Sequence, residues 1–243
     1  MAQRMTNIFN ETTPDSAPQT NAEQPRPFAP PRCFLPPRVV FVDEHFIVVD
    51  KASGLLSVPG RDINNRDCVV SRLEKDYGQI LVVHRLDFDT SGLLILARTA
   101  KTQSELSKQF QNRSVEKIYE AMVWGIVEKD EDEINLPLAL DWPNRPLHKV
   151  DYETGKASLT HYRVIERNAE KNQTRLGLFP VTGRSHQLRV HLQAIGHPIL
   201  GCPLYGNEES RAAAERLLLH AKVLEVTHPI SGERMRFEAV VPF

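Results

Sequence analysis

Cysteine is scarce in this chain of 243 residues, and the cysteines present form no recognisable pattern. Cys33, Cys68 and Cys202 are scattered and odd in number, so they provide neither a disulfide framework nor paired zinc-ligand spacing. This usage fits a reducing compartment. The sequence also lacks any apolar run of the roughly 18 residues needed to span a bilayer, and its N-terminus lacks the apolar core of a secretory signal. We therefore expect a cytoplasmic protein that is not inserted in a membrane.

An excess of one charge sign is missing as well. The 30 Lys and Arg residues nearly balance the 31 Asp and Glu residues, which gives a formal net charge of −1. Bulk charge therefore favours no class of partner, and binding to a nucleic acid would require a local basic patch. The segment 98–117 is a candidate, with five basic residues against two acidic ones, although a solvated helix face has the same composition.

The first 33 residues have little apolar content and many Pro, Gln, Thr and Asn residues. Such a segment buries too little apolar surface to offset its ordering entropy. We expect residues 1–33 to be a disordered tail, either inert or in contact with RNA. We expect residues 34–243, in a chain with 41% hydrophobic residues, to form the folded domain.

Hydrophobic periodicity and turn residues predict strands that alternate with a few helices after residue 37. We expect an acidic, solvated loop at 128–133, an irregular loop at 141–146, and a helix near 185–195 that begins at Ser185 and ends before Gly196. The other predicted strands are 38–42, 46–49, 118–124, 159–166, 175–181, 217–226 and 235–240, and the other predicted helices are 67–77, 100–112 and 208–216.

One polar segment, residues 84–92, lies between two apolar runs of strand length at 81–83 and 93–97. Its sequence is His-Arg-Leu-Asp-Phe-Asp-Thr-Ser-Gly. Catalytic groups are often mounted where a rigid strand leads into a loop, because the scaffold holds them in place. A tight turn with no catalytic role would use the same Asp, Thr, Ser and Gly residues.

Asp87 and Asp89 in this segment allow three interpretations. A phosphotransfer or metal site would need a later acidic pair at a strand end, which the sequence lacks. A glycosidase-type carboxylate pair has no support for its required separation. A single nucleophilic Asp would need a nearby Arg to keep it ionised. Arg85 and Arg184 are the candidates, and Arg184 is the better one because a strand-to-helix turn fixes it.

The nine histidines do not have the spacing of a metal site. His186 and His191 are five residues apart, which places them poorly on one helix face. Most other histidines stand alone beside apolar or turn residues, where a structural role is favoured. We predict no bound metal.

Several ordered motifs together resemble the RluA family of pseudouridine synthases, over about residues 38–243. The resemblance implies an α/β fold with a mixed, largely antiparallel sheet flanked by helices and a central catalytic cleft. The stretches that carry it are His84-Arg85-Leu86-Asp87 with Thr90-Ser91-Gly92, Lys117-Ile118-Tyr119, residues 182–191, residues 196–201, and Leu219-His220-Ala221 with His228-Pro229.

The resemblance implies isomerisation of uridine to pseudouridine within RNA, with no cofactor. It assigns three catalytic residues: Asp87 as nucleophile, Tyr119 stacked on the target base and helping to move its proton, and Arg184 paired with Asp87. It also makes Arg85 and Tyr119 contacts to the RNA, with Arg85 entering the space that the flipped base leaves.

Within the family, the loops at 53–61 and 141–146 resemble members that act on both 23S rRNA and the anticodon stem-loop of tRNAs. We expect the same RNA partners and a monomer. One departure is Cys202, where the family usually has Asp, which puts a local turn or hydrogen bond in doubt. The alternatives are a synthase of the same family with another RNA site and a non-catalytic RNA-binding protein of this fold.

Overall fold

The computed structural model describes residues 33–60 and 62–243, so the predicted tail lies outside the described residues apart from Cys33. Most strands belong to one sheet, and they are β1 (Arg38–Val42), β2 (Phe46–Lys51), β3 (Leu81–Val82), β4 (Ser91–Ala97), β5 (Glu116–Trp124), β6 (Glu131–Asn135), β9 (Leu159–Asn168), β10 (Gln173–Pro180), β11 (Leu219–Thr227) and β12 (Arg234–Glu238). A separate hairpin consists of β7 (Leu138–Leu140) and β8 (His148–Val150). The helices are α1 (Val69–Tyr77), α2 (Ala100–Gln111), α3 (Gln187–Ala194) and α4 (Glu208–Ala212).

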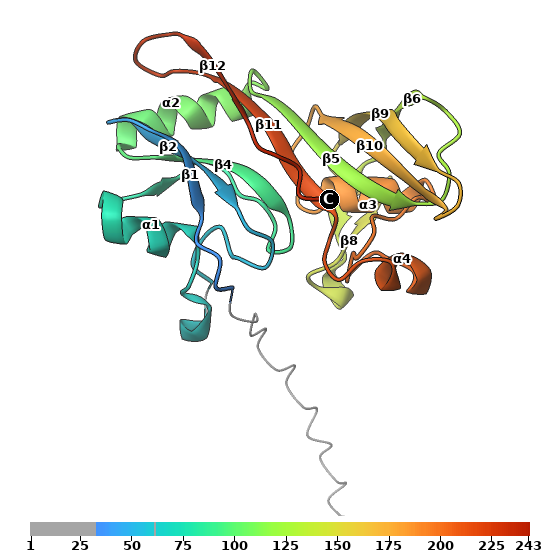
Figure 1. The fold of residues 1–243 in the computed structure, drawn as a ribbon. Coiled ribbons are helices and arrows are strands. Elements are labelled where there is room, and N and C mark those ends of the chain that lie inside the picture. The colour runs from blue at the N-terminus through green and yellow to red at the C-terminus, as the bar shows by residue number, and fades with distance from the viewer. Residues whose placement is uncertain (1–32, 61) are drawn as a thin grey trace, which may run out of the picture.

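The ten-stranded sheet runs in the order β1-β2-β4-β11-β5-β10-β9-β6, with β3 added at β4 and β12 added at β11 (Figure 1). Among the described strands, β4 and β11 form the one parallel pair, and all others are antiparallel. The predicted fold class, a mixed and largely antiparallel sheet flanked by helices, is confirmed.

The N-terminal half of the sheet, built from β1 to β4, is covered on both faces, by α1 on one and by α2 on the other (Figure 1). Successive side chains of β2 point to opposite faces. Ile47 and Val49 pack into the core that includes α1, whereas Phe46 and Val48 pack into the core that includes Leu106 of α2. Burial on both faces explains why β4 reads as a continuous apolar run.

The C-terminal half packs β5, β10 and β9 against α3, which lies behind them in Figure 1. Leu188 and Leu192 of α3 contact the core that includes Leu176 and Leu178 of β10. Tyr119 of β5 packs against this core and also against the core beneath α1. Tyr119 therefore lies where the two halves of the molecule join.

Two expectations about secondary structure are wrong. Residues 131–133 of the predicted acidic loop belong to the edge strand β6, in which Ile134 is buried while Glu131 and Glu133 are exposed, and exposed charges are common on edge strands. The helix expected at 208–216 ends at Ala212, because residues 213–218 run beside residues 199–201 instead, where the Leu218 amide donates to the Leu200 carbonyl. In the part of the chain that the structure describes, no helix is long and apolar enough to cross a membrane.

Candidate active site

Asp87 lies in the loop between β3 and β4, and the preceding segment 51–57 holds the main chain of that loop. The Ser57 hydroxyl donates to the Leu86 carbonyl at 2.8 Å and accepts from the Leu86 amide at 3.1 Å. The Ser53 hydroxyl donates to the Asp89 carbonyl at 2.6 Å. Hydrogen bonds on both sides of Asp87 therefore fix the main chain that carries it.

Lys51 is the buried cation of this support. Its ammonium group donates to the carbonyls of Ala52, Leu55 and Phe88 at 2.9, 2.8 and 3.0 Å. Burial lowers the pKa of Lys51 to about 7, although the nearby Asp87 and Asp89 carboxylates act in the opposite direction. Through these three carbonyl acceptors, Lys51 holds the main chain of the loop in place.

The Thr-Ser-Gly turn after Asp89 anchors the other end of the loop to β11. Ser91 Oγ lies 2.9 Å from His220 Nδ1, and Gly92 is paired with Ala221 in the parallel ladder. Gly92 has φ +109°, and a Cβ there would lie 2.3 Å from the Ala221 carbonyl oxygen. Only glycine lets the two strands approach this closely.

Tyr119 and Asp87 line the same pocket. Burial, with a further contribution from the Asp87 charge, raises the pKa of Tyr119 well above its ordinary value. The phenol therefore keeps its proton at neutral pH. It is an aromatic face with a neutral hydroxyl, placed beside a carboxylate.

The arginine that pairs with Asp87 is Arg189, and the predicted partner Arg184 is wrong. Arg189 Nη1 lies 3.5 Å from Asp87 Oδ2, and Arg189 Nη2 lies 3.6 Å from Asp89 Oδ2. The exposed Arg184 instead donates to the Ala157 carbonyl at 3.4 Å. The reason is that α3 begins at Gln187, so Arg184 stays on the loop before the helix while the first turn carries Arg189 inward.

Arg189 is almost completely buried, with its side chain 2% exposed. Burial acts to lower the pKa of Arg189, but Cys202, Asp87 and Asp89 outweigh it, so the pKa is raised and the guanidinium stays charged. Its Nε and Nη2 atoms find no hydrogen-bond acceptor of ordinary geometry among the described residues. Cys202, the departure noted in the sequence, therefore lies beside an incompletely satisfied cation.

His186 adds a second group that faces Asp87. Its Nε2 lies 3.9 Å from Asp87 Oδ2, and its Nδ1 lies 2.6 Å from the Tyr205 hydroxyl. Burial lowers the pKa of His186 to about 4, although the Asp87 charge opposes this. Because the His186 ring is uncharged at neutral pH, Arg189 carries the positive charge that pairs with Asp87.

Asp89 differs from Asp87 although both approach Arg189. The pKa of Asp89 is raised, chiefly by burial and also by the charge of Asp87, against the opposing charge of Arg189. Its backbone carbonyl is engaged by Ser53, as described above. Asp89 is not part of the pocket lining, whereas Asp87 is.

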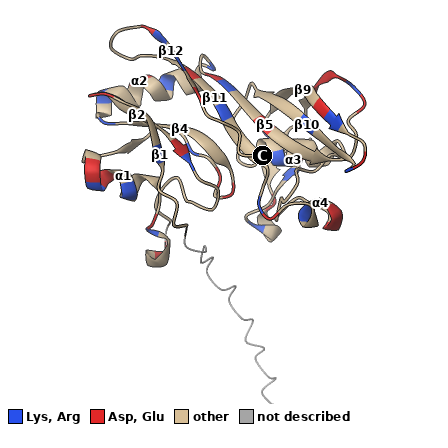
Figure 2. Cartoon of the chain, in the orientation of Figure 1, with Lys and Arg blue, Asp and Glu red and all other residues tan. Residues whose placement is uncertain are grey.

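The pocket around Asp87 has a volume of about 110 Å³, smaller than the range of about 300–1,000 Å³ that is typical of small-molecule sites. Arg85, Lys117, Arg184 and Arg189 line it, with Asp87 as the one carboxylate in the lining. A protein with a net charge of −1 thus concentrates positive charge here. Figure 2 shows acidic positions towards the periphery, on α1, on α4 and before β6.

The residues of the predicted basic segment 98–117 have different surroundings. The Arg98 side chain donates to the Asp43 carbonyl, and Lys108 pairs with Glu105 at 2.7 Å. Arg113 and Lys117 instead line a groove that continues from the Asp87 pocket and shares Arg184 with it. Burial lowers the pKa of Lys117, which has no carboxylate partner in the described part of the chain.

Within the described residues, no group of three or more His, Cys, Asp and Glu side chains could hold a metal ion. His84 accepts the Ile95 amide at Nε2 and stacks on Phe110 with ring centroids 4.5 Å apart. His191 is bonded to Thr160 and to the Leu136 carbonyl. These two histidines are structural.

The sequence predicts that Asp87, Tyr119, Arg184 and Arg85 belong to one site. In the structure all four line one pocket. The sequence did not predict that Arg189 and His186 face Asp87. Every residue from Gln187 to Leu192 is buried, so α3 has no solvent-facing side that would mark Arg189 as unusual. The signal in the sequence is the alternation of Arg189 with Leu188 and Val190, because a charged residue between apolar neighbours points to a buried ion pair.

Residues 45–194 match the family model described as RNA pseudouridylate synthase. The chain belongs to the RNA pseudouridylate synthase family. The "Dual-specificity RNA pseudouridine synthase RluA" of Escherichia coli strain K12 is 51% identical over 205 residues, which cover 84% of this chain and 93% of that protein. The Vibrio parahaemolyticus protein of the same name is 53% identical over 196 residues, covering 79% of this chain and 78% of that protein. The resemblance to the RluA family is confirmed, and the chain is an enzyme that isomerises uridine in RNA.

Solved structures agree with this family. Human RNA Pseudouridylate Synthase Domain Containing 1 superposes with a TM-score of 0.72 at 28% identity, covering 88% of this chain and 86% of that one. Human RNA Pseudouridylate Synthase Domain Containing 4 has a TM-score of 0.67 at 22% identity, covering 84% of this chain and 88% of that one, and supports the fold alone.

Proposed function

We propose that this enzyme converts specific uridines to pseudouridine in both 23S rRNA and the anticodon stem-loop of tRNAs, with Asp87 as the nucleophile. The observation that carries the proposal is the pairing of Asp87 with the buried Arg189 in a pocket that Tyr119 also lines. Dual specificity is supported by relatives about half identical over most of the chain that carry it in their names.

In the proposed reaction, Asp87 attacks the target nucleotide as a carboxylate. A nucleophilic carboxylate must be ionised, and a guanidinium at 3.5 Å favours the ionised form. The bond between N1 of the base and the sugar breaks, the base turns and is rejoined to the sugar through carbon five, and Asp87 is regenerated as the free carboxylate. Carbon five loses its proton and N1 gains one. Atoms and oxidation states balance within the nucleotide, so the proposal includes no cofactor.

Tyr119 is proposed to stack on the target base and to help move the proton from carbon five. Its neutral phenol suits both roles, because it offers an aromatic face and a hydroxyl beside Asp87. Arg85 is exposed and makes no hydrogen bond or ion pair within the described part of the chain. Its planar guanidinium is proposed to enter the space left when the base flips out of the RNA.

Arg184 is proposed to bind the RNA backbone, together with Lys117 and Arg113. All three line the groove that continues from the catalytic pocket. Arg113 and Arg184 are exposed and Lys117 is half-buried, and cations along a groove of this kind suit a phosphate backbone. Residues 34–243 are proposed to act as one catalytic domain, as a monomer in the cytoplasm.

The test measures tritium release from RNA carrying tritiated uridine at carbon five, in the presence of a chelator. Two substrates are compared, an anticodon stem-loop and a 23S rRNA fragment. We expect the wild-type enzyme to release tritium from both, and Asp87→Ala to release none above background. Asp89→Asn is the matched control, since it changes a carboxylate two residues away that also faces Arg189.

Release that survives in Asp87→Ala would overturn the assignment of the nucleophile. Release from one RNA alone would overturn dual specificity and leave a synthase with a single class of target. A panel of other rRNA and tRNA fragments would then identify the site of the alternative, a family member with a different target.

A further inference from the structure

The loop between β7 and β8 is not used by the proposed reaction, although β8, which follows it, is hydrogen-bonded to Tyr205 and through Tyr205 to His186 of the site. We propose that Trp142 and Arg145 in this loop form a platform on which an unpaired base of the substrate RNA stacks, next to the target uridine. The proposal rests on the proposed function, because it takes a single-stranded RNA segment as the occupant.

Trp142 is unusually placed for its residue type. Its side chain is 67% exposed, although tryptophan is normally highly buried. The Arg145 guanidinium carbon lies 4.6 Å from the centroid of its ring. All residues from 142 to 146 are exposed, so this aromatic ring contributes little to a core and is open to a partner.

The loop is ordered by its own hydrogen bonds. The Asp141 amide donates to the Leu147 carbonyl at 2.9 Å, and the Asn144 amide donates to the Asp141 carbonyl at 3.0 Å. The Asn144 side chain donates to the Asp141 carboxylate at 2.9 Å. A surface held in this way loses little conformational entropy when it binds a ligand.

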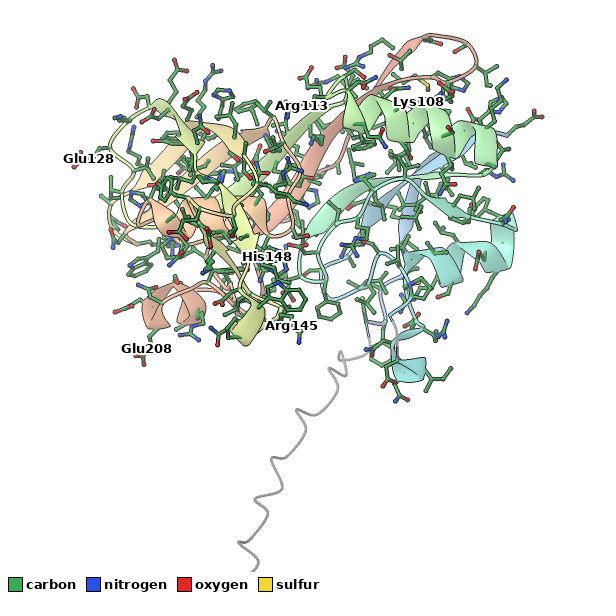
Figure 3. All side chains as sticks on the ribbon, turned by 180° about the vertical axis from the view of Figure 1, so that it is seen from behind. Lys108, Arg113, Glu128, Arg145, His148 and Glu208 are labelled. Carbon is green, nitrogen blue, oxygen red and sulfur yellow. The ribbon has the colours of Figure 1, made fainter. Side chains whose placement is uncertain are left out.

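The hairpin is connected directly to the groups around Asp87. The amide of His148, at the start of β8, donates to the Tyr205 hydroxyl at 2.9 Å, and the same hydroxyl lies 2.6 Å from His186. His186 in turn lies 3.9 Å from Asp87. In the view of Figure 3, Arg145 and His148 lie where the two halves of the molecule meet.

Charge and chemistry favour RNA as the occupant. Arg145 has no carboxylate partner among the described residues, so its donors are available to a phosphate while its plane covers the indole. Single-stranded RNA is recognised mainly by bases stacked on aromatic rings and on guanidinium planes. An exposed Trp-Arg pair on a hairpin that is hydrogen-bonded to Tyr205 combines these features.

The direct test uses the indole itself as the probe. The chain has two tryptophans, Trp124 and Trp142. A Trp124→Phe variant therefore leaves Trp142 as the one fluorophore of its kind, and adding Asp87→Ala prevents turnover. We expect the anticodon stem-loop to quench this fluorescence saturably, along the same binding curve as the anisotropy of a labelled RNA. No quenching at concentrations that saturate the anisotropy would overturn the proposal.

The kinetic test uses Trp142→Ala in the otherwise wild-type enzyme. Stacking of one base on an aromatic ring accounts for affinity changes of about 10-fold or more. We expect KM for the stem-loop to rise about 10-fold with kcat within about twofold, and Trp142→Phe to recover most of the loss. Tyr152→Ala is the matched control, an aromatic side chain 77% exposed beyond the far end of the same hairpin, and its KM should not change.

The two proposals fail in different ways. Tritium release by the wild-type enzyme tests the proposed function without any change in the hairpin. Suppose that the wild-type enzyme releases tritium from the stem-loop, but that RNA does not quench the Trp142 fluorescence or that Trp142→Ala leaves KM unchanged. This result overturns the platform alone. Absence of both RNA binding and release would overturn the platform and the proposed RNA targets together.

Discussion

The two walls of the catalytic pocket are built differently. One wall is the loop 84–92, in which side chains of segment 51–57 hold the backbone carbonyls on either side of Asp87. The other wall is the segment 181–189, where Arg184 is exposed on a loop and Arg189 is buried in the first turn of α3. The first wall positions the carboxylate through its main chain, and the second supplies charge through a buried side chain.

The difference between the two walls predicts which property each kind of substitution should change. Changes in the first wall disturb packing between strands, so they should appear mainly as losses of stability. Changes in the second wall remove positive charge beside Asp87, the proposed nucleophile, or from the proposed RNA contact, so they should appear mainly in kcat or in KM. Four sets of substitutions test this division.

The largest effect is expected for the two arginines of the second wall. Arg189→Gln removes the partner of Asp87, and we expect kcat to fall by about 100-fold or more, as for other lost electrostatic groups at reacting centres. Arg184→Gln should instead raise KM and leave kcat within about threefold. Single-turnover tritium release with saturating RNA separates the two. Equal losses of kcat in both variants would contradict the assignment of Arg189.

Gly92→Ala tests the anchoring of the first wall. The new Cβ would meet the Ala221 backbone at 2.3 Å, in a residue whose φ is already unfavourable for alanine. We expect the free energy of unfolding to fall by about 3 kcal/mol or more, measured by urea denaturation. Gly232→Ala, with φ +75° and no atom within 4 Å, is the control and should cost about 1–2 kcal/mol.

Cys202→Asp should stabilise the folded protein through Arg189 of the second wall. The new carboxylate would lie beside Arg189, whose Nε and Nη2 atoms find no acceptor of ordinary geometry in the described chain. We expect a gain in unfolding free energy of about 1 kcal/mol, seen as a higher Tm. The gain should vanish in an Arg189→Gln background. A gain that persists there would show that it does not come from this pair.

The smallest effect is expected for Asp89→Asn, and its sign depends on pH. Because the folded-state pKa of Asp89 is raised, the folded protein holds the proton more tightly than the unfolded chain. The protonated form contributes stability below the unfolded value, and this is lost as pH rises through the folded pKa. Asn imitates the protonated form, so the variant should have the higher Tm at pH 7. The difference should shrink as pH falls toward 4, and a constant difference would contradict this account.

Most of the fold was predictable because its signals are local. The hairpin of β1 and β2 and the helices α1, α2 and α3 were predicted to within a few residues, from alternation, helical spacing and Gly or Thr at their ends. Strand β6 was not predicted, because its charged residues resemble a solvated loop. They lie in a strand because the backbone of β9 supplies a partner along the sheet edge.

The sequence by itself determined which chemical groups enter the site, since Asp87, Tyr119, Arg85 and Arg184 stand in ordered motifs and all line one pocket. Only the tertiary structure decided which arginine pairs with Asp87. Arg184 and Arg189 are five residues apart, and the choice depends on where α3 begins and which side of it faces the loop. Spacing along the chain cannot rank two such neighbours, because an ion pair depends on distance and burial, which packing between distant segments establishes.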